Sequence, residues 1–244
     1  MIEHYYRFPK HVTEKFVGDS LDKTNWDILR TDDDTPFFMI PDSKKEYDDY
    51  CATRRSYEKH ASMIIDSLIE QGMSDDESIC SLGIGIGILE WHILNKYSPI
   101  KLSCTDFAEE GLKKVSNFLE ATEFFAFDLC SDNYAILTHF DNLLLYRMST
   151  EFDICTWKNI FNKFYIFGCK KIVFVPTEFA TLEDEKREKE AHEECIRKGE
   201  KDMFCGWLYS EEEYYDMFSA WYSVSSLKRV DNTGIFILER KEGN

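Results

Sequence analysis

The sequence predicts an α/β fold with a mainly parallel sheet and helices on both faces. Short apolar runs alternate with amphipathic segments along residues 79–175, which is typical of repeated βα units. A glycine-rich turn interrupts the apolar segment Ser78–His92 (SICSLGIGIGILEWH), as expected where a buried strand passes into a helix. Two strand-like segments, Ser223–Val230 and Gly234–Glu239, are joined by a short polar turn, and we expect them to form a terminal β-hairpin.

The N-terminal segment is predicted to be an arm that covers the main domain. Residues 1–45 show no sustained period, and they contain the acidic run Asp32-Asp33-Asp34. The apolar cluster Phe37-Phe38-Met39 is expected to hold the arm against the core. From about Glu46 to Gly72 a helix with one buried face is indicated by the helical spacing of Tyr57, Ala61, Ile64 and Leu68.

Strands and helices are predicted to alternate through the middle of the chain. The strands are short apolar runs at Ile79–Leu82, Ile100–Cys104, Phe124–Phe127, Leu143–Met148 and Ile172–Val175. The helices between them are expected at Ile88–Lys96, Ala108–Glu120, Asn133–His139 and Phe152–Phe167. Pro99 and Pro176 mark turns, and Gly168 is predicted to end the last of these helices at its C-cap position.

A charged helical insertion is predicted at about residues 177–221. Residues 181–202 are almost all charged, which is typical of a solvated helix. A capping-box pattern at Ser210–Glu213 starts a second helix. We therefore divide the chain into an arm with its covering helix, residues 1–72, and a core domain, residues 73–244.

The composition argues against several classes of partner. The chain has 46 acidic and 29 basic residues, a formal net charge of −17, and such a surface repels the phosphate backbone of nucleic acids. The basic pairs Lys113-Lys114 and Lys170-Lys171 are short. We therefore expect no nucleic-acid partner, and a homodimer is left open.

The cysteines and the apolar runs indicate the compartment. The eight cysteines form no C-x-x-C pair, so we expect reduced thiols and neither disulfides nor a metal site. The first residues lack the apolar stretch of a signal peptide. The apolar run around Ile79–Leu89 is too short and too rich in glycine to span a bilayer. We expect a cytoplasmic protein that does not associate with membranes.

The glycine turn is the most selective motif. Glycine permits positive φ and lets the backbone approach a bound cofactor closely. A dinucleotide fingerprint, G-x-G-x-x-G, would need glycine where the chain has Ile88. Glycine instead occupies every second position, Gly83, Gly85 and Gly87. This segment resembles motif I of the class I S-adenosylmethionine (SAM) methyltransferases.

The resemblance covers about residues 75–175 and the terminal hairpin. It implies a Rossmann-like methyltransferase fold, with a seven-stranded, mostly parallel sheet, an antiparallel last strand, helices on both faces and an N-terminal helical arm. It also implies SAM as the cofactor. The residues of the glycine segment that would contact SAM are Ser81, Gly83, Ile84, Gly85 and Gly87.

A second cofactor contact is implied where the second strand ends. By resemblance, Asp106 would accept hydrogen bonds from the ribose hydroxyls, which its charge strengthens, and Phe107 would lie against the adenine. Asp106 also precedes a helix with Glu109 three positions on, which is typical of an N-cap. The two roles are compatible.

The third and fourth strands end in further residues of the resemblance. Asp128 would accept from the adenine amino group and Leu129 would meet the ring, although an Asp after a strand is also a common turn residue. Tyr146 and Arg147 would line the cofactor pocket where the sulfonium and the acceptor meet.

Two positions depart from the family. The family usually has an acid two residues before the first motif glycine, where it steadies the cofactor's ammonium group, and this chain has Ser81 there. No Asn/Asp-Pro-Pro-Tyr motif follows the fourth strand, which argues against methylation of amino groups on nucleic-acid bases.

The groups that would orient or deprotonate an acceptor are less well defined. The candidates are Glu151, Asp153, His60 and Tyr57. The two acids also suit the start of a helix, where the macrodipole favours negative charge. Arg54-Arg55 would hold a carboxylate or phosphate of the substrate, or form a solvated face, and His92 is interpreted as a packed helix residue.

These observations predict a SAM-dependent methyltransferase of class EC 2.1.1 that acts on a small molecule. In such an enzyme the alignment of acceptor, methyl and sulfur supplies most of the rate. One alternative is a methyltransferase-like binding or regulatory module without catalysis, which Ser81 favours. A second is an NAD-dependent oxidoreductase, which Ile88 and the terminal hairpin disfavour.

Overall fold

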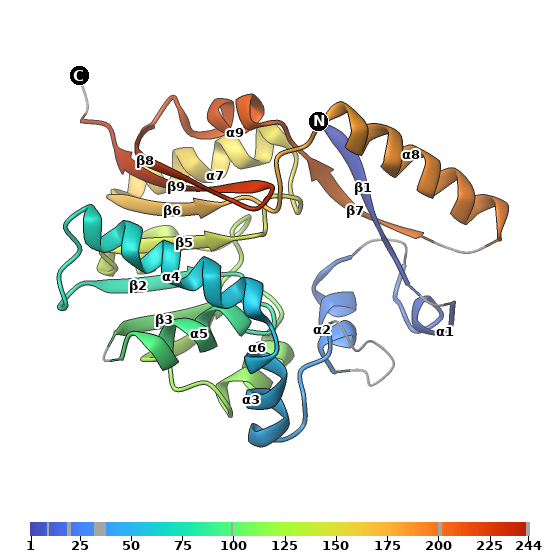
Figure 1. The fold of residues 1–244 in the computed structure, drawn as a ribbon, viewed down its shortest axis with the longest axis horizontal. Helices are drawn as coiled ribbons and strands as arrows, with labels where there is room; N and C mark the ends of the chain where they lie inside the picture. The colour runs from blue at the N-terminus through green and yellow to red at the C-terminus, as the bar shows by residue number, and fades with distance from the viewer. Residues whose placement is uncertain (9, 19–20, 32–37, 99, 200–201, 243–244) are drawn as a thin grey trace.

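A seven-stranded sheet forms the centre of the computed structural model, which describes residues 1–8, 10–18, 21–31, 38–98, 100–199 and 202–242 (Figure 1). Its strands are β2 (Ser78–Leu82), β3 (Lys101–Asp106), β4 (Glu123–Ala126), β5 (Asn142–Tyr146), β6 (Lys171–Val175), β8 (Tyr222–Val230) and β9 (Thr233–Arg240). Their spatial order is β4-β3-β2-β5-β6-β9-β8. β9 alone runs in the opposite direction to the other six strands: it pairs antiparallel with β6 and β8, whereas β2 to β6 pair in parallel. The predicted sheet and its hairpin are confirmed.

Helices cover both faces of this sheet, as predicted. One face packs against α3 (Lys44–Ala52), α4 (Arg55–Glu70), α5 (Ile88–Lys96) and α6 (Glu109–Ser116). The other packs against the 3-10 helix η1 (Tyr134–His139), α7 (Ile154–Phe167) and α9 (Glu211–Phe218). The central strands are buried on both sides, which is why they are nearly continuous apolar runs. Gly168 caps α7 with φ +86°, as predicted.

The single helix predicted from Glu46 to Gly72 is wrong, because the chain forms two helices there. Ser43 caps α3 and accepts from the Glu46 amide. Thr53 then ends α3, and its hydroxyl donates to the Tyr50 carbonyl at 2.7 Å. Because of this break, α3 lies beside the glycine turn, where the Tyr47 hydroxyl donates to the Ile86 carbonyl at 2.9 Å.

The arm and the insertion also contain strands that the sequence did not predict. β1 (Ile2–Arg7) pairs antiparallel with β7 (Asp202–Leu208) in a separate two-stranded sheet. The arm continues with α1 (Lys10–Thr13) and α2 (Lys23–Thr31), and the charged helix of the insertion is α8 (Leu182–Arg197). The insertion is therefore not wholly helical. Once the charged run ends, Met203, Cys205 and Leu208 supply buried side chains.

Residues of the arm pack on the start of α6. Trp26, Leu29 and Phe8 form a small apolar core with Ala108, and Phe38 packs against it, as expected for this cluster. The predicted acidic run at 32–34, Phe37 of the predicted apolar cluster and the turn at Pro99 lie outside the described residues.

A close backbone contact fixes β7 against the loop after β5. The Trp207 amide donates to the Thr150 carbonyl at 3.0 Å. Gly206 has φ +142°, and a Cβ on it would lie 1.6 Å from the same carbonyl oxygen. Only glycine fits there. Through this contact the β1–β7 sheet and the arm stand over the carboxyl ends of β2 and β5 (Figure 1).

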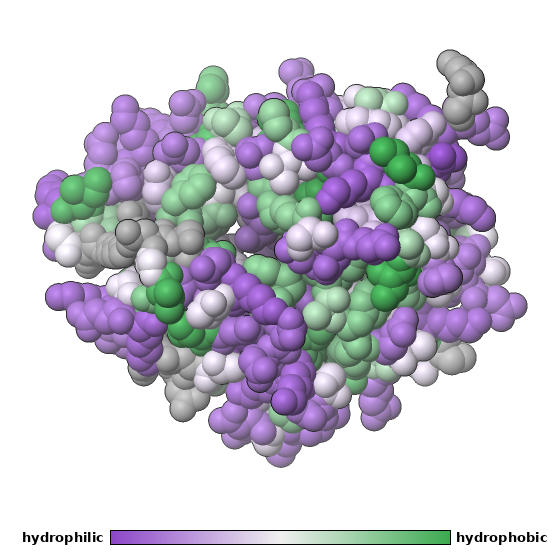
Figure 2. Space-filling model, turned by 180° about the vertical axis from the view of Figure 1, so that it is seen from behind, coloured by the Kyte–Doolittle hydropathy of each residue, from purple (hydrophilic) through white to green (hydrophobic). Residues whose placement is uncertain are grey.

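The surface is mainly hydrophilic, with apolar residues exposed in separate groups (Figure 2). Among the described residues, no helix has the length and apolar character needed to cross a membrane. All eight cysteines have free thiols.

Candidate functional site

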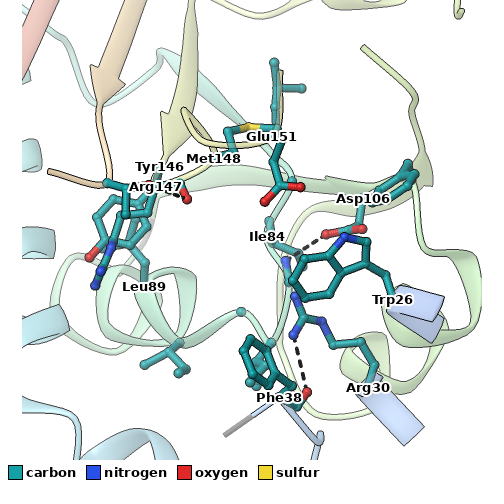
Figure 3. A pocket seen from close by; sticks show the side chains of 18 of the residues that line it. Trp26, Arg30, Phe38, Ile84, Leu89, Asp106, Tyr146, Arg147, Met148 and Glu151 are labelled. Carbon is teal, nitrogen blue, oxygen red and sulfur yellow. Dashed lines mark hydrogen bonds between the residues drawn. The ribbon is translucent and has the colours of Figure 1, made fainter. Parts of the chain in front are cut away.

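A cavity of about 710 Å³ opens at the carboxyl ends of β2, β3 and β5 (Figure 3). The strand order reverses between β2 and β5, and open α/β sheets bind ligands at such a point. The volume is within the range of about 300–1,000 Å³ that is usual for small-molecule sites. The arm supplies the facing wall with Tyr6, Trp26, Arg30 and Phe38.

The glycine turn forms the floor of the cavity. Gly83, Gly85 and Gly87 have φ values of +70°, +58° and +78°, a region that glycine enters without steric cost. The turn is held to β3 because the amides of Gly83 and Ile84 both donate to the Thr105 carbonyl, at 2.9 and 3.0 Å. The last glycine is the N-cap of α5, so the helix begins at the cavity.

Asp106 lies at the end of β3, beside this turn. Its carboxylate accepts from the Gly85 amide at 2.8 Å and from the Ala108 amide at 2.9 Å. The predicted N-cap role is wrong, because Ala108 occupies the N-cap of α6. Burial raises the pKa of Asp106, and the nearby Arg30 guanidinium opposes that rise. Phe107 also lines the cavity.

Ser81 does not line the cavity, but it contacts an acid that does. Its hydroxyl donates to a carboxylate oxygen of Glu90 at 2.6 Å. Glu90 lies in the first turn of α5 and is only 2% exposed. Burial raises the pKa of Glu90 to about 7. Within the described part of the chain, no cation lies within ion-pair distance of it. The sequence signal for Glu90 was its position as the single acid among apolar residues at the start of α5.

Arg30 was missed by the sequence analysis because its segment shows no period. Its guanidinium lies over the Trp26 ring, 4.7 Å from the centroid, and donates to the Phe38 carbonyl at 3.4 Å. A Cβ on Gly85 would be 2.8 Å from Nη2 of Arg30. Figure 3 shows the guanidinium next to the glycine turn and below Asp106.

The opposite end of the cavity is built around Tyr146. Its hydroxyl hydrogen-bonds to Nδ1 of His60 at 2.7 Å, and Nε2 of His60 lies 3.2 Å from a carboxylate oxygen of Asp231. His60 itself does not line the cavity, and burial lowers its pKa. Tyr57 does line it, with its ring centroid 5.7 Å from that of Tyr146. Arg147 follows with φ +54°.

The two acids predicted after β5 have different positions. Glu151 lines the cavity, and burial raises its pKa to about 7 although Arg30 opposes the rise. Asp153 is instead the N-cap of α7 and accepts from the Thr156 amide at 2.8 Å. The capping role is therefore the one that the structure supports for Asp153.

Asp128 lies in the cavity wall after β4, together with Leu129. Its carboxylate accepts from the Cys130 amide at 2.8 Å and from the Ser131 hydroxyl at 2.7 Å. In this structure it therefore organises its own turn. His92 is a buried helix residue, as predicted, and Nε2 donates to the Cys51 carbonyl at 3.1 Å.

No protein-family model matches the chain, and no curated protein matches it. Solved structures do match. The magnesium protoporphyrin IX methyltransferase of Synechocystis PCC 6803, with bound SAM, superposes with a TM-score of 0.58 at 10% identity, over 92% of this chain and 100% of that chain. Human N-acetylserotonin methyltransferase, in complex with SAM, gives 0.51 at 17% identity, over 67% of this chain and 47% of that chain. The pyocyanin biosynthetic protein PhzM superposes with a TM-score of 0.52 at 14% identity, over 78% of this chain and 56% of that chain.

In this chain an antiparallel β9 lies between β6 and β8, and a glycine turn lies at the point where the strand order reverses. The chain therefore has the Rossmann-like fold of the class I SAM-dependent methyltransferases.

Proposed function

We propose that the chain is a SAM-dependent methyltransferase of class EC 2.1.1 and that its acceptor is a small molecule. One observation carries the proposal: the glycine turn, Asp106 and Glu90 line the same cavity. Among the described residues, Glu90 forms no ion pair. The proteins of similar fold support it, since by name they include methyltransferases of magnesium protoporphyrin IX and N-acetylserotonin.

The residues present fit SAM group by group. Asp106 would accept from the ribose hydroxyls, and Phe107 and Leu129 would pack on the adenine. Glu90 would face the cofactor's ammonium group, because it brings a carboxylate to the side chain of Ser81, where the family usually has an acid. This arrangement speaks against the inactive-module alternative that Ser81 alone favoured.

When bound, SAM would supply a methyl group on a positively charged sulfur. The chain's own residues would align the acceptor and receive its proton. Glu151 lines the cavity, and burial raises its pKa to about 7. Such a group is well matched to general-base work. Tyr146 is held in place by His60 and would orient the acceptor.

The experiment is calorimetric titration with S-adenosylhomocysteine (SAH), the demethylated product, together with melting curves. We expect binding in the micromolar range and a melting temperature that rises with ligand excess. Absence of heat and of any thermal shift at millimolar SAH, with the protein folded, would refute the proposal. A parallel titration with NAD tests the oxidoreductase alternative, which binding of NAD without SAH would establish.

A further inference from the structure

The arginines of this chain divide into two groups. Nine arginines are present. Five of them form ion pairs with carboxylates: Arg7, Arg55, Arg187, Arg197 and Arg229. The remaining four have no carboxylate within 4.0 Å in the described structure: Arg30, Arg54, Arg147 and Arg240. Three of these four line the cavity.

This concentration matters because acidic residues outnumber basic ones, 46 to 29. In a chain with this excess of acidic residues, an arginine is expected to form an ion pair with a carboxylate. Arg240 lies outside the cavity and is accommodated by Tyr165, whose carbonyl it contacts at 3.2 Å and whose ring it overlies at 4.3 Å. Arg30 lies near enough to Asp106 and Glu151 to favour their charged forms. Arg54 and Arg147 are therefore the two cavity arginines for which the described structure shows no paired carboxylate.

Arg147 lies at the end of the cavity away from Asp106 (Figure 3). Arg54 is the N-cap of α4, three residues before Tyr57, and both residues line the cavity. The ring of Tyr57 approaches that of Tyr146, and Arg147 is the next residue. Figure 3 shows Arg147 beside Tyr146, across the cavity from Arg30.

The backbone at Arg147 adds a second observation. Its φ of +54° is uncommon for a residue with a side chain. Its amide donates to the Val175 carbonyl at 2.8 Å, and its carbonyl accepts from the Thr177 hydroxyl at 3.1 Å. Strained residues held in this way cluster at functional sites. The conformation places the side chain of Arg147 in the cavity wall.

The cofactor's carboxylate does not account for all three arginines. SAM carries one carboxylate, and Arg30 already lies over the glycine turn, where the cofactor is proposed to bind. Arg54 overlies the Tyr50 ring at 4.5 Å, and Tyr57, Tyr146 and Leu89 also line the cavity. Arginine guanidinium groups bind carboxylates and phosphates through two parallel hydrogen bonds. Aromatic side chains in a cavity wall pack favourably against aromatic rings of a ligand.

We infer that Arg54 and Arg147 bind a carboxylate or phosphate on an aromatic methyl acceptor, whose ring lies against Tyr57. This inference rests on the proposed function, since it assigns this end of the cavity to the acceptor. It makes the natural acceptor an aromatic anion.

The test is a ligand-observed NMR screen of matched pairs of aromatic carboxylic acids and their primary amides, such as 2-naphthoate and 2-naphthamide, against SAH-loaded protein. We expect the acids to bind at least tenfold more tightly than their amides. The double variant Arg54→Gln/Arg147→Gln should lower the affinity for the acids to that for the amides. Arg240→Gln, the arginine outside the cavity, is the matched control and should keep the preference.

Three results would overturn the inference. They are equal binding of acids and amides, no binding of either class, or a preference for acids that survives in the double variant. SAH affinity tests the rival source of the anion. We expect Arg54→Gln, which keeps Arg147, to bind SAH within twofold of wild type. A tenfold loss for SAH in this variant, with none for 5′-methylthioadenosine, which lacks the carboxylate, would assign Arg54 to the cofactor instead.

Failure of the proposed function would look different. In that case the wild-type protein would not bind SAH at all. The comparison of acids with amides would then be run on the unloaded protein, where it still reports whether Arg54 and Arg147 select anions. Melting curves of each variant show that the protein compared is folded.

Discussion

Replacement of Glu90 by Gln should make the protein more stable and weaken its affinity for the cofactor. Burial raises the pKa of Glu90 from 4.5 to about 7 in the folded chain. Between these pH values the unfolded chain loses the proton while the folded chain keeps it, so stability falls as pH rises and the loss is complete above about pH 7. This difference in pKa between the unfolded and the folded chain corresponds to at most about 3 kcal/mol of unfolding free energy.

Gln cannot ionise, yet it can still accept the hydrogen bond from Ser81. The Glu90→Gln protein should therefore be up to about 3 kcal/mol more stable than wild type at pH 8, and this gain should shrink towards zero near pH 5. Asp106 and Glu151 also have raised pKa values. They remain in both proteins, so the difference between the two proteins isolates Glu90.

The effect on SAH binding has the opposite sign. A hydrogen bond between charged groups is worth about 1.5–3 kcal/mol, so the variant should bind SAH about 10- to 150-fold more weakly at pH 8. Wild-type affinity should fall about tenfold per pH unit below pH 7, because the ammonium group then has to displace the proton of Glu90. The variant should lose the part of this pH dependence that comes from Glu90.

Denaturant unfolding and calorimetry at pH 5, 6, 7 and 8 would measure both effects. 5′-Methylthioadenosine lacks the ammonium group and should bind wild type and variant equally. Glu110→Gln, at an exposed acid of α6, is the control for loss of a surface charge. A variant that is less stable than wild type at pH 8, or that binds SAH as wild type does, would refute the reasoning.

Three other substitutions, the last with a matched control, test the site and its support. Asp106→Asn should weaken SAH binding about 10- to 150-fold by calorimetry, and unchanged affinity would show that this carboxylate only holds the glycine turn. Gly85→Val should abolish detectable SAH binding in a folded protein, because φ is +58° there and the added side chain would stand in the cavity; wild-type affinity by titration would remove the turn from the site. Gly206→Ala should cost about 2–4 kcal/mol in denaturant unfolding, because its Cβ would strike the Thr150 carbonyl. Gly199→Ala, also at positive φ but with nothing within 4 Å, should cost only about 1–2 kcal/mol, and equal losses would show that the close contact is unimportant.

The sheet was predictable from the sequence because each of its central strands is a short apolar run with a punctuating residue beside it. The glycine turn was predictable for a related reason. Gly83, Gly85 and Gly87 all need positive φ, a demand that composition reveals directly. Of the residues predicted to contact the cofactor, Ser81 alone does not line the cavity.

The parts that could not be predicted depend on contacts between distant segments. Arg30 reaches the glycine turn only because α2 packs on α6, and the Gly111 amide donates to Asp27 there at 3.1 Å. No local pattern marks such a contact. Likewise β7 follows a charged helix, and its strand character depends on a partner, β1, at the other end of the chain.

The pairing of β1 with β7 also sets an order of events during synthesis. Ile2 lies opposite Leu208 in this pair, so β1 is synthesised long before the strand with which it pairs. The sheet from β2 to β6 needs no such partner and can form while translation continues. Tyr6, which lies in β1 and in the cavity wall, therefore reaches its place after the glycine turn has formed. A nascent chain would present the cavity floor open to solvent before the arm covers it.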